Sequence, residues 1–525
     1  MKLRKVLALV MALCMVLSLS AFASSGEAGG ASGGMGMPGG GGSSKPDSYD
    51  AVIEVTEDAE FVGETLGSVN GDENVIHVFD GAKATVSDCV VTNEGQGSGG
   101  DNSSFYGVGA SLFVSDGELY VSDTTIDSTT AGGAGVFAYD TGVAYVSGAT
   151  ISTTEGSAGG LHVAGGGTLY AWDCDVTTQA SMAAAAIRSD RGGGLMVVDG
   201  GSYVTEGGTG AVYVTADISI HDAYLYTGGS EAVAIEGKNS IRLFDCSLEG
   251  VMTPSSLNDN RTWNIIVYQS MSGDADVGTS EYDMIGGSLI THAGPVLLNT
   301  NTKSYITFSD VDITYGEDTT YFLQVTGNSS SRTWGTAGKN GADCIFSAYN
   351  QAMEHDVMYD TISNLDFYML EGSTFEGAML CDNEYNGGYE GDGIMNMYID
   401  KDSVWTVTGD SVISGTLYLE GTIEGAKVVG TDGTVYVDGE GFTVTVGAFS
   451  DKVDSSAAGQ IPVWEDYAVE NPFASASGEP SGEASAEAGE EEVVAMNMAD
   501  GSTPPDPPAD LAPGEEPPGG FGGID

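Results

Sequence analysis

Proline is scarce in most of this chain, and its distribution is informative. Nine of the 14 prolines lie from Pro472 onward, and only Pro254 and Pro295 occur between Ser48 and Ile461. A proline has no N–H to donate to a ladder, so it is excluded from interior strands. Sustained helical periodicity is missing from the same region. The near absence of proline over about 400 residues therefore indicates a region that is mostly strand.

Positive charge is also scarce. The chain has 16 Lys and Arg against 76 Asp and Glu, which gives a formal net charge of −60. Nucleic acid and anionic lipid are bound through clustered Lys and Arg, so a chain this acidic repels both. We therefore expect no nucleic-acid partner. The charge is compatible with cations, including Ca²⁺, and with neutral sugars, although solubility outside the cell explains most of it.

Only one long apolar run occurs, and it lies at the N-terminus. Lys2, Arg4 and Lys5 form a basic start, the uncharged run 6–22 follows, and Ala23 ends a small-x-small cleavage site. This pattern is typical of a secretory signal peptide, which we assign to residues 1–23. A retained anchor is the alternative, although the run is short for a span. We predict a secreted, extracellular protein with no integral membrane segment after cleavage, either released or held noncovalently at the cell surface.

Low-complexity sequence flanks the proline-poor region. Residues 24–49 are rich in Gly and Ser, and residues 469–525 are acidic and rich in Pro, Glu and Ser. Such segments cannot bury a core, so we expect a disordered linker and a disordered tail. Between the strand-rich region and the tail, residues 451–468 are expected to form a C-terminal cap.

A repeat of about 25 residues runs through the middle of the chain. Representative copies are "LYVSDTTIDSTT" (119–130), "AYVSGATISTTE" (144–155), "LYAWDCDVTTQA" (169–180) and "IRLFDCSLEG" (241–250). Each copy holds three short segments separated by Gly, Asp, Asn and Ser turns, which predicts three short strands per coil. A repeat this short cannot close its own core and must stack on its neighbours. We therefore predict an all-β solenoid over residues 50–450.

The "V-x-[DG]-x-x-I" repeats and the "GG" turns resemble those of the pectin-lyase-like superfamily. They look in particular like its branch of adhesin-like, repeat-containing exported proteins from Gram-positive anaerobic bacteria. The resemblance covers residues 50–450 and implies a right-handed parallel β-helix. It does not imply one activity, because that superfamily includes lyases, hydrolases, phage spikes and adhesins.

Aspartate recurs at the bend of each repeat. We place Asp123, Asp173, Asp199, Asp222 and Asp245 in one column, with neighbours about 5 Å apart where the coils are adjacent. Like charges this close repel unless water, backbone amides or a cation intervenes. Two interpretations are open. The column could bind calcium as a ladder, or each aspartate could be a turn residue that bonds to its own backbone.

Five cysteines remain after the leader, and an odd, widely spaced set is no disulfide framework. Cys89, Cys174 and Cys246 each follow an aspartate of the repeat and lie three coils apart, or roughly 14 Å. A disulfide requires Cα atoms within about 7 Å. We predict that these three are small buried core residues.

Five of the 16 Lys and Arg fall within residues 188–261, and two of them lie in one turn of the repeat. Arg191 follows Asp190 in "SDRGGG", and Lys238 follows Glu236 in "IEGKNS", at nearly equivalent repeat positions two coils apart. Arg could donate bidentate bonds to a sugar or carboxylate there, while Trp263 or Tyr268 stacks on a ring. A catalytic version would use Arg191 or Lys238 as base and Asp190 as acid. Compensating ion pairs within an acidic protein are the third interpretation.

The repeats break at 251–281 and 326–358, and each break contains an Arg-Thr-Trp, at 261–263 and 332–334. We expect these segments to be loops that project from the solenoid or lengthened coils. Stacking explains neither these loops nor the turn with the Arg and Lys, so any function is to be sought there.

Three functions are compatible with these features. The catalytic blocks of polygalacturonase-like and pectate-lyase-like enzymes are missing, and the five histidines are scattered singly. The leading hypothesis is a secreted, adhesin-like, non-catalytic protein that binds polysaccharide or a cell-surface or host component, requiring no cofactor. A polysaccharide lyase or glycoside hydrolase is the first alternative. A structural matrix or spacer protein is the second.

Overall fold

The computed structural model describes residues 44–474, apart from 181, 256–257 and 330–333. The predicted signal peptide, most of the linker and nearly all of the acidic tail lie outside these residues. The first strand begins at Asp50 and the last ends at Ser450. Nearly every strand pairing between them is parallel, which confirms the prediction of an all-β chain built from stacked parallel strands.

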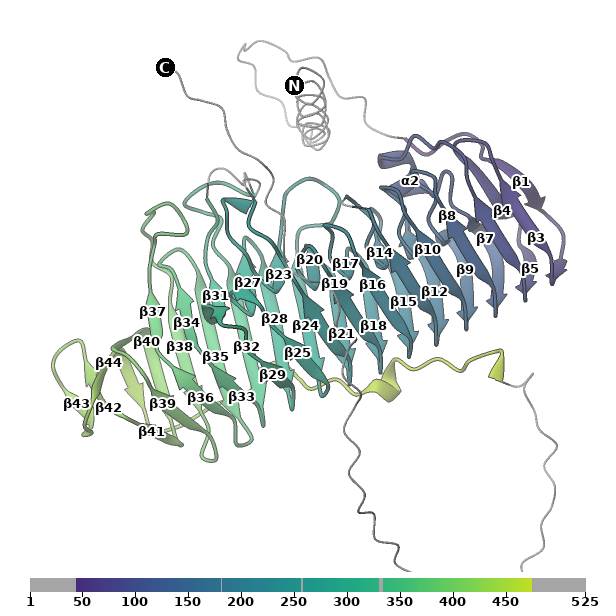
Figure 1. Ribbon diagram of the computed structural model, residues 1–525. Coiled ribbons are helices and arrows are strands. Elements are labelled where there is room, and N and C mark those ends of the chain that lie inside the picture. Colours follow the sequence, from purple (N-terminus) through teal and green to yellow (C-terminus); the bar gives the residue numbers. More distant parts are fainter. Residues whose placement is uncertain (1–43, 181, 256–257, 330–333, 475–525) are drawn as a thin grey trace, which may run out of the picture. The chain divides into compact units, whose positions relative to one another are not determined.

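A regular coil contains three strands, and each strand pairs in parallel with the equivalent strand of the next coil. Figure 1 shows this stacking along the chain. In one coil these are β11, β12 and β13, which pair in parallel with β14, β15 and β16. We call the resulting stacks the first, second and third ladders.

The first ladder contains β1 (Asp50–Val55), β4 (Glu73–Val78), β11 (Leu161–Ala164), β14 (Ile187–Ser189), β17 (Val212–Val214), β20 (Val233–Glu236), β23 (Ile265–Tyr268), β27 (Leu297–Thr300), β31 (Tyr321–Val325), β34 (Asp356–Tyr359) and β37 (Met379–Cys381). The second contains β2 (Ala59–Val62), β5 (Ala82–Ser87), β12 (Gly167–Trp172), β15 (Gly194–Asp199), β18 (Asp217–His221), β21 (Ser240–Phe244), β24 (Thr279–Ile285), β28 (Lys303–Ser309), β32 (Asp343–Tyr349), β35 (Asn364–Leu370), β38 (Met395–Ile399), β40 (Ser411–Leu419) and β44 (Phe442–Ser450). The long strands β7 (Leu112–Ser122) and β9 (Val136–Ser147) belong to both.

The third ladder has two sections. The first contains β3 (Thr65–Ser68), β6 (Val90–Asn93), β8 (Thr125–Ser128), β10 (Thr150–Thr153), β13 (Asp175–Thr178), β16 (Ser202–Thr205), β19 (Tyr224–Thr227), β22 (Ser247–Gly250), β25 (Ser288–Ile290) and β29 (Asp312–Thr314). The second contains β33 (Ala352–Glu354), β36 (Thr374–Gly377), β39 (Val404–Val407) and β41 (Thr422–Glu424). Outside the ladders, β26 (Ala293–Gly294) pairs with β30 (Asp318–Thr319). At the C-terminal end, β42 (Ala426–Gly430) pairs in parallel with β44 and antiparallel with β43 (Val435–Val437).

The core fills the inside of the coils. Alternate side chains of each strand point inward, and the same column is apolar from coil to coil because the parallel register is in step. In the third ladder, for example, Ile126, Ile151 and Val176 stack in line, each at most 1 % exposed. Repeats that cannot bury an apolar face alone therefore do so through their neighbours.

The bend between the second and third ladders is a column of left-handed residues. Asp123, Asp173, Asp222 and Asp245 have φ between 47° and 52°, and glycine occupies the same column in intervening coils. Aspartate tolerates this backbone better than most side chains. These features agree with the turn interpretation of the aspartates.

Asp199 does not belong to this column. Its register partners are Trp172 and His221, so it lies one residue before the bend. The bend position is Gly200, which has φ of +75°. A Cβ at Gly200 would lie 2.4 Å from the Asp173 carboxylate, and this close approach accounts for glycine there. The repeat spacing alone misplaced Asp199 by one residue because adjacent Asp and Gly both favour the bend.

The cysteines that follow the bend are buried, as predicted. Cys89, Cys174 and Cys246 are at most 2 % exposed and free of disulfides. Each Sγ lies 3.2–3.4 Å from the carbonyl oxygen two residues earlier. Burial raises the pKa of Cys174 and of Cys246 to about 12, so these thiols are unreactive core groups.

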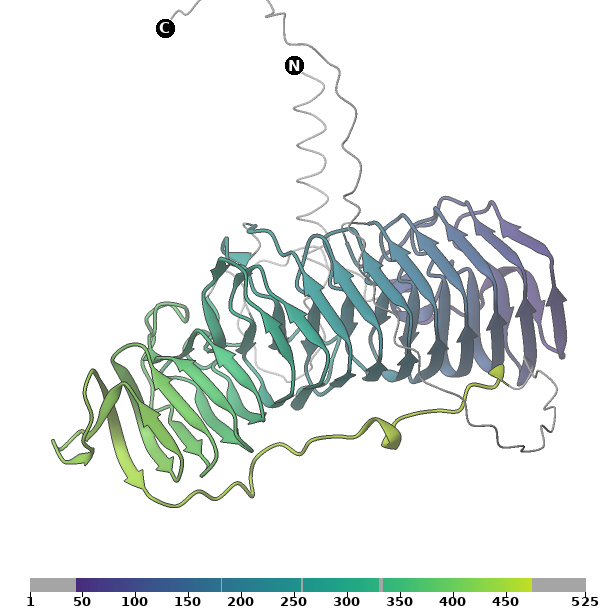
Figure 2. The ribbon, with the colours of Figure 1, turned by 60° about the horizontal axis from the view of Figure 1, so that its bottom comes forward.

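Residues 451–474 form a strap, which differs from the predicted cap over residues 451–468. After β44 the chain turns back and runs along the outside of the second ladder toward its N-terminal coils (Figure 2). Gly459 donates its N–H to Ser347, and Trp464 stacks on His221 with ring centroids 4.7 Å apart. Near its end, the Phe473 ring lies 6.2 Å from that of Tyr120.

Helix is rare in the described residues. α2 (Asp101–Tyr106) lies in the loop before β7, and the short 3-10 helix η2 (Trp464–Asp466) lies in the strap. Within the part of the chain described, neither has the length and apolar character that a membrane span requires.

Candidate functional site

The outer face of the first ladder is covered by the loops that connect the third ladder to the next coil. Its central column of outward side chains is in continuous register from coil to coil. That column consists of His77, Phe113, Phe137, His162, Arg188, Tyr213, Ala234, Ile266, Leu298, Gln324 and Met358. Most of these residues are buried although they point away from the core. This face therefore has a second, external layer of packing.

The N-terminal part of the column is a tight ring stack. The ring centroids of His77 and Phe113 lie 4.7 Å apart, and those of Phe137 and His162 lie 4.1 Å apart. Burial lowers the pKa of His77 and of His162 to about 4, so both rings are neutral at physiological pH. All four rings are buried and belong to the outer packing layer.

Asp190 lies at the next step of the face and is fully engaged. It is 3 % exposed, and its carboxylate lies 2.7 Å from Arg188 Nε and 2.9 Å from His162 Nε2. A second guanidinium nitrogen of Arg188 donates to Ser104 in α2. Arg188 thus ties the loop that carries α2 to the first ladder, and the buried Asp190 carboxylate holds Arg188 and His162 in place.

Arg191 points to a different partner. Its guanidinium donates to Asp274 at 2.7 Å and lies 4.2 Å from the centre of the Phe105 ring. Asp274 comes from the first of the two repeat breaks, so this pair joins two loops across three coils. Asp190 and Arg191 are each held in an ion pair, which agrees with the interpretation of this turn as compensating ion pairs.

Glu236 is the centre of a buried hydrogen-bond network. Its carboxylate accepts from the hydroxyls of Tyr213 at 3.0 Å, Tyr268 at 3.1 Å and Ser270, and it is 2 % exposed. Burial raises the pKa of Glu236, and burial also holds the pKa of both tyrosines well above the ordinary value. Lys238 is separate from this network. Its side chain is exposed, and its backbone N–H donates to the Asp276 carbonyl.

The structure therefore does not bring the six predicted ligand-binding residues together in one site. Glu236 and Tyr268 are hydrogen-bonded, and Tyr268 and Trp263 line the same hollow. Asp190 and Arg191 serve separate pairs instead of one binding surface.

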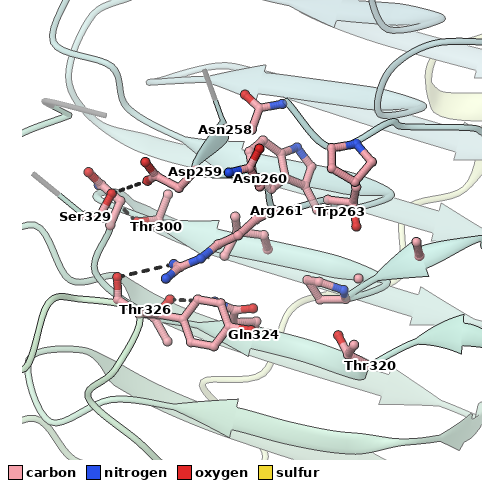
Figure 3. Close-up of a pocket in the computed structure, with 18 of the residues that line it drawn as sticks. Asn258, Asp259, Asn260, Arg261, Trp263, Thr300, Thr320, Gln324, Thr326 and Ser329 are labelled. Atoms are coloured by element: carbon pink, nitrogen blue, oxygen red, sulfur yellow. Dashed lines mark hydrogen bonds between the residues drawn. The ribbon is translucent and has the colours of Figure 1, made fainter. Parts of the chain in front are cut away.

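An open cleft of about 420 Å³ lies over the middle of the first ladder, which we call the Arg261 cleft. Its floor is formed by outward residues of β27 and β31, and its sides come from both repeat breaks and from Tyr385. Figure 3 shows Arg261 extending across it between Asn258 and Asp259 on one side and Gln324 on the other. The Arg261 guanidinium lies 4.0 Å from the centre of the Tyr385 ring, which holds it in place.

Two more hollows adjoin this cleft along the ladder. The tryptophan hollow, of about 300 Å³, is lined by Trp263, Tyr268, Trp334, Met252 and Glu231 among others, and it shares both tryptophans with the Arg261 cleft. The Phe105 hollow, of about 570 Å³, shares Glu231 with the tryptophan hollow. We refer to the three together as the groove. The two tryptophans come from the two Arg-Thr-Trp sequences, so loops 71 residues apart in sequence meet in one site.

Sequence reasoning missed several residues of the groove. Trp334 carried a signal, since its Arg-Thr-Trp repeats that of Trp263, although it was not among the predicted site residues. Phe105, Tyr213 and Tyr385 lie in no sequence pattern that would have marked them as site residues. They lie in different coils and loops, and only the folding of the loops onto the first ladder brings them near the groove.

The aspartates of the bend column lie on a different edge, between the second and third ladders. Asp123 and Asp173 are separated by the coil of Gly148, and Asp173 and Asp222 by the coil of Gly200. Among the described residues, no three His, Cys, Asp or Glu side chains are grouped so as to hold a metal ion. The calcium interpretation of this column stays a prediction.

Comparisons with protein-family models, with curated proteins and with solved structures found no match for this chain.

Proposed function

We propose that this protein binds polysaccharide in the groove, as a secreted, adhesin-like and non-catalytic protein. The observation that carries the proposal is the Arg261 cleft, a concave site that combines aromatic rings with polar groups. Ligand pockets in general are lined mainly by apolar and aromatic side chains with a few convergent polar groups. This combination suits a sugar, which has apolar faces and a polar rim.

The composition of the cleft supports this ligand class. Trp334 and Tyr385 supply ring surface, while Asn258, Thr320 and Gln324 supply side-chain amide and hydroxyl groups. Such groups both donate and accept, as sugar hydroxyls do. The adjoining hollows extend the site along the ladder, which suits a chain of sugars better than a single one.

We also infer that the coils are right-handed and that the chain is a remote member of the pectin-lyase-like superfamily. Crossover connections between parallel strands of one sheet are right-handed in nearly all known cases. The three-strand coil and its repeats are what that resemblance implies, and the signal-peptide pattern at 1–23 supports export.

Glycan-array binding with the full chain after the leader tests the proposal. We expect at least one polysaccharide ligand, whose affinity falls by about tenfold or more in Trp334→Ala or Arg261→Ala, because each removes ring stacking or polar contact. Tyr224→Ala is the matched control, since Tyr224 is 43 % exposed on the third ladder, away from the groove. A broad array with no ligand, or a ligand lost equally in Tyr224→Ala, would count against groove binding.

A further inference from the structure

The groove is acidic in the part of the chain that the structure describes. Six different carboxylates line its three hollows: Asp101, Asp190, Glu231, Asp259, Asp274 and Asp318. Two of them, Asp190 and Asp274, are paired with arginines, so the excess of negative charge comes from the other four. Arg188 and Arg261 are the basic residues among the described lining residues. A polyanion such as a polyuronate would meet repulsion here, because desolvated like charges repel strongly.

Both arginines are already engaged. Arg188 is paired with Asp190 at 2.7 Å, and its side chain is 6 % exposed. Arg261 is stacked on Tyr385 and donates toward the Tyr385 carbonyl at 3.5 Å. Neither arginine lines the tryptophan hollow in the part of the chain described, so no guanidinium there competes with a positively charged ligand.

The tryptophan hollow lies at the centre of the groove and has the lining of a site for an organic cation. Tyr268 and Trp334 pack with ring centroids 4.5 Å apart and form one wall, and Trp263 and Met252 form another part of the lining. Aromatic faces carry negative charge density and attract ammonium groups. Glu231 supplies a carboxylate, while the described lining contains no Lys, Arg or His.

From these observations we infer that the groove recognises a ligand carrying organic ammonium groups, with the ammonium held in the tryptophan hollow between the aromatic rings and Glu231. This inference rests on the proposed function and names the class of glycan. The ammonium has two chemical sources, the primary amine of an amino-sugar polymer and a quaternary ammonium substituent on a sugar. A bare metal ion is not favoured, because the described residues hold no group of three ligating side chains.

The test is calorimetric titration of the full chain after the leader, at physiological salt. The probes are glucosamine oligosaccharides, their fully N-acetylated counterparts and galacturonate oligosaccharides, with choline and its neutral isostere 3,3-dimethylbutan-1-ol as small ligands. We expect glucosamine oligosaccharides or choline to bind about tenfold or more tightly than the matched neutral probe. Preference for glucosamine identifies an amino-sugar polymer, and preference for choline identifies a quaternary substituent. Either result supports the inference.

A chain of this charge attracts any polycation, so a control must remove charge without touching the groove. Glu231→Gln removes the carboxylate of the hollow and should lower ammonium affinity severalfold with little effect on the neutral probes. Glu376→Gln removes the same charge from an exposed position of β36 and should leave the affinity unchanged. Equal losses in the two variants would overturn the inference and indicate nonspecific attraction.

The inference and the proposed function fail in different ways. Equal affinity for glucosamine and N-acetylglucosamine oligosaccharides, each lost in Trp334→Ala, would overturn the ammonium site and leave glycan binding intact. Binding of galacturonate oligosaccharides in preference to both would also overturn it. The failure of every glycan, including those of the array, would overturn the proposed function, and the failure of choline as well would overturn both.

Discussion

The outer faces of the first and second ladders are built from the same coils and are covered in different ways. The second ladder is crossed by one continuous segment, the strap, which contacts it from β35 back to β7. The first ladder is covered by separate loops, one from each coil. The three hollows of the groove lie on the first ladder, and none of their described lining residues belongs to the strap.

The two coverings have different physical consequences. A strap follows the ladder and places a side chain at successive coils, such as Trp464 on His221 and Tyr467 near Phe244. Loops of unequal length do not fill space evenly, and the two repeat breaks border both the Arg261 cleft and the tryptophan hollow. A solenoid can therefore gain stability on one face and a binding groove on another while its core stays the same.

Removal of the strap should produce the largest effect. A chain that stops after Ser450 exposes rings such as Phe244 and Tyr368, whose burial is worth about 1.5–3 kcal/mol for a fully buried side chain. We expect a loss of about 5 kcal/mol and a fall in Tm of about 10 °C. Differential scanning calorimetry measures the fall in Tm. A chain that stops after Ala474 is the control, because it keeps the strap.

Glycan binding should survive this truncation at temperatures below the new Tm, because the groove lies on the other face. The milder variant Trp464→Ala should lower stability by about 1–2 kcal/mol with unchanged binding. Trp334→Ala should show the reverse pattern, with weaker glycan binding and little change in stability. Loss of binding with the strap, at a temperature where the coils remain folded, would show that the two faces are not independent.

The second effect is a pH dependence of the folding stability, which arises from a carboxyl group beneath the strap. Asp283 is 2 % exposed, and burial together with nearby Glu281 raises its pKa to about 8. Between the unfolded value near 4 and about 8, the folded chain holds a proton that the unfolded chain has released. Stability therefore falls as pH rises through this range, by up to about 1.4 kcal/mol per pH unit.

Thermal melts at pH 5, 6, 7 and 8 measure this slope. Asp283→Asn keeps the shape and removes the titration, so its Tm should vary less with pH than that of the unaltered chain. If the two chains show the same pH dependence, Asp283 is not its source.

The smallest expected effect concerns calcium. The bend aspartates alternate with glycine in several coils, and their backbone conformation alone explains their recurrence. We expect millimolar Ca²⁺ and a chelator to leave the Tm within about 1 °C of each other. A rise in Tm with Ca²⁺ that is lost in Asp173→Asn would instead support a calcium ladder, because a ligand that binds only the folded state stabilises it.

The repeat made much of the fold predictable. Period-2 alternation, the bend residues and the lack of proline are local signals, and they were sufficient to predict a solenoid of stacked short strands with Cys89, Cys174 and Cys246 in the core. The same signals misplaced Asp199 by one residue, because Asp and Gly compete for the bend and only the pairing with Trp172 and His221 resolves the register.

The candidate site was predictable in part. Trp263, Glu236 and Tyr268 were singled out from the sequence, and the structure places them in or beside the groove. The burial of Asp190 was not predictable, since its partners His162 and Arg188 lie on neighbouring strands and are aligned by the register. The same holds for Arg191, whose partner Asp274 is 83 residues away.

The sequence by itself determined the repeating coil, because a strand, a left-handed bend and an apolar column each depend on residues within one repeat or its neighbour. The tertiary structure alone decided what covers the outside of those coils. The path of the strap over the second ladder and the meeting of Trp263 with Trp334 over the first depend on contacts between residues far apart in the chain. Such contacts are specified by the shape and chemistry of the folded surface, and no local pattern encodes them.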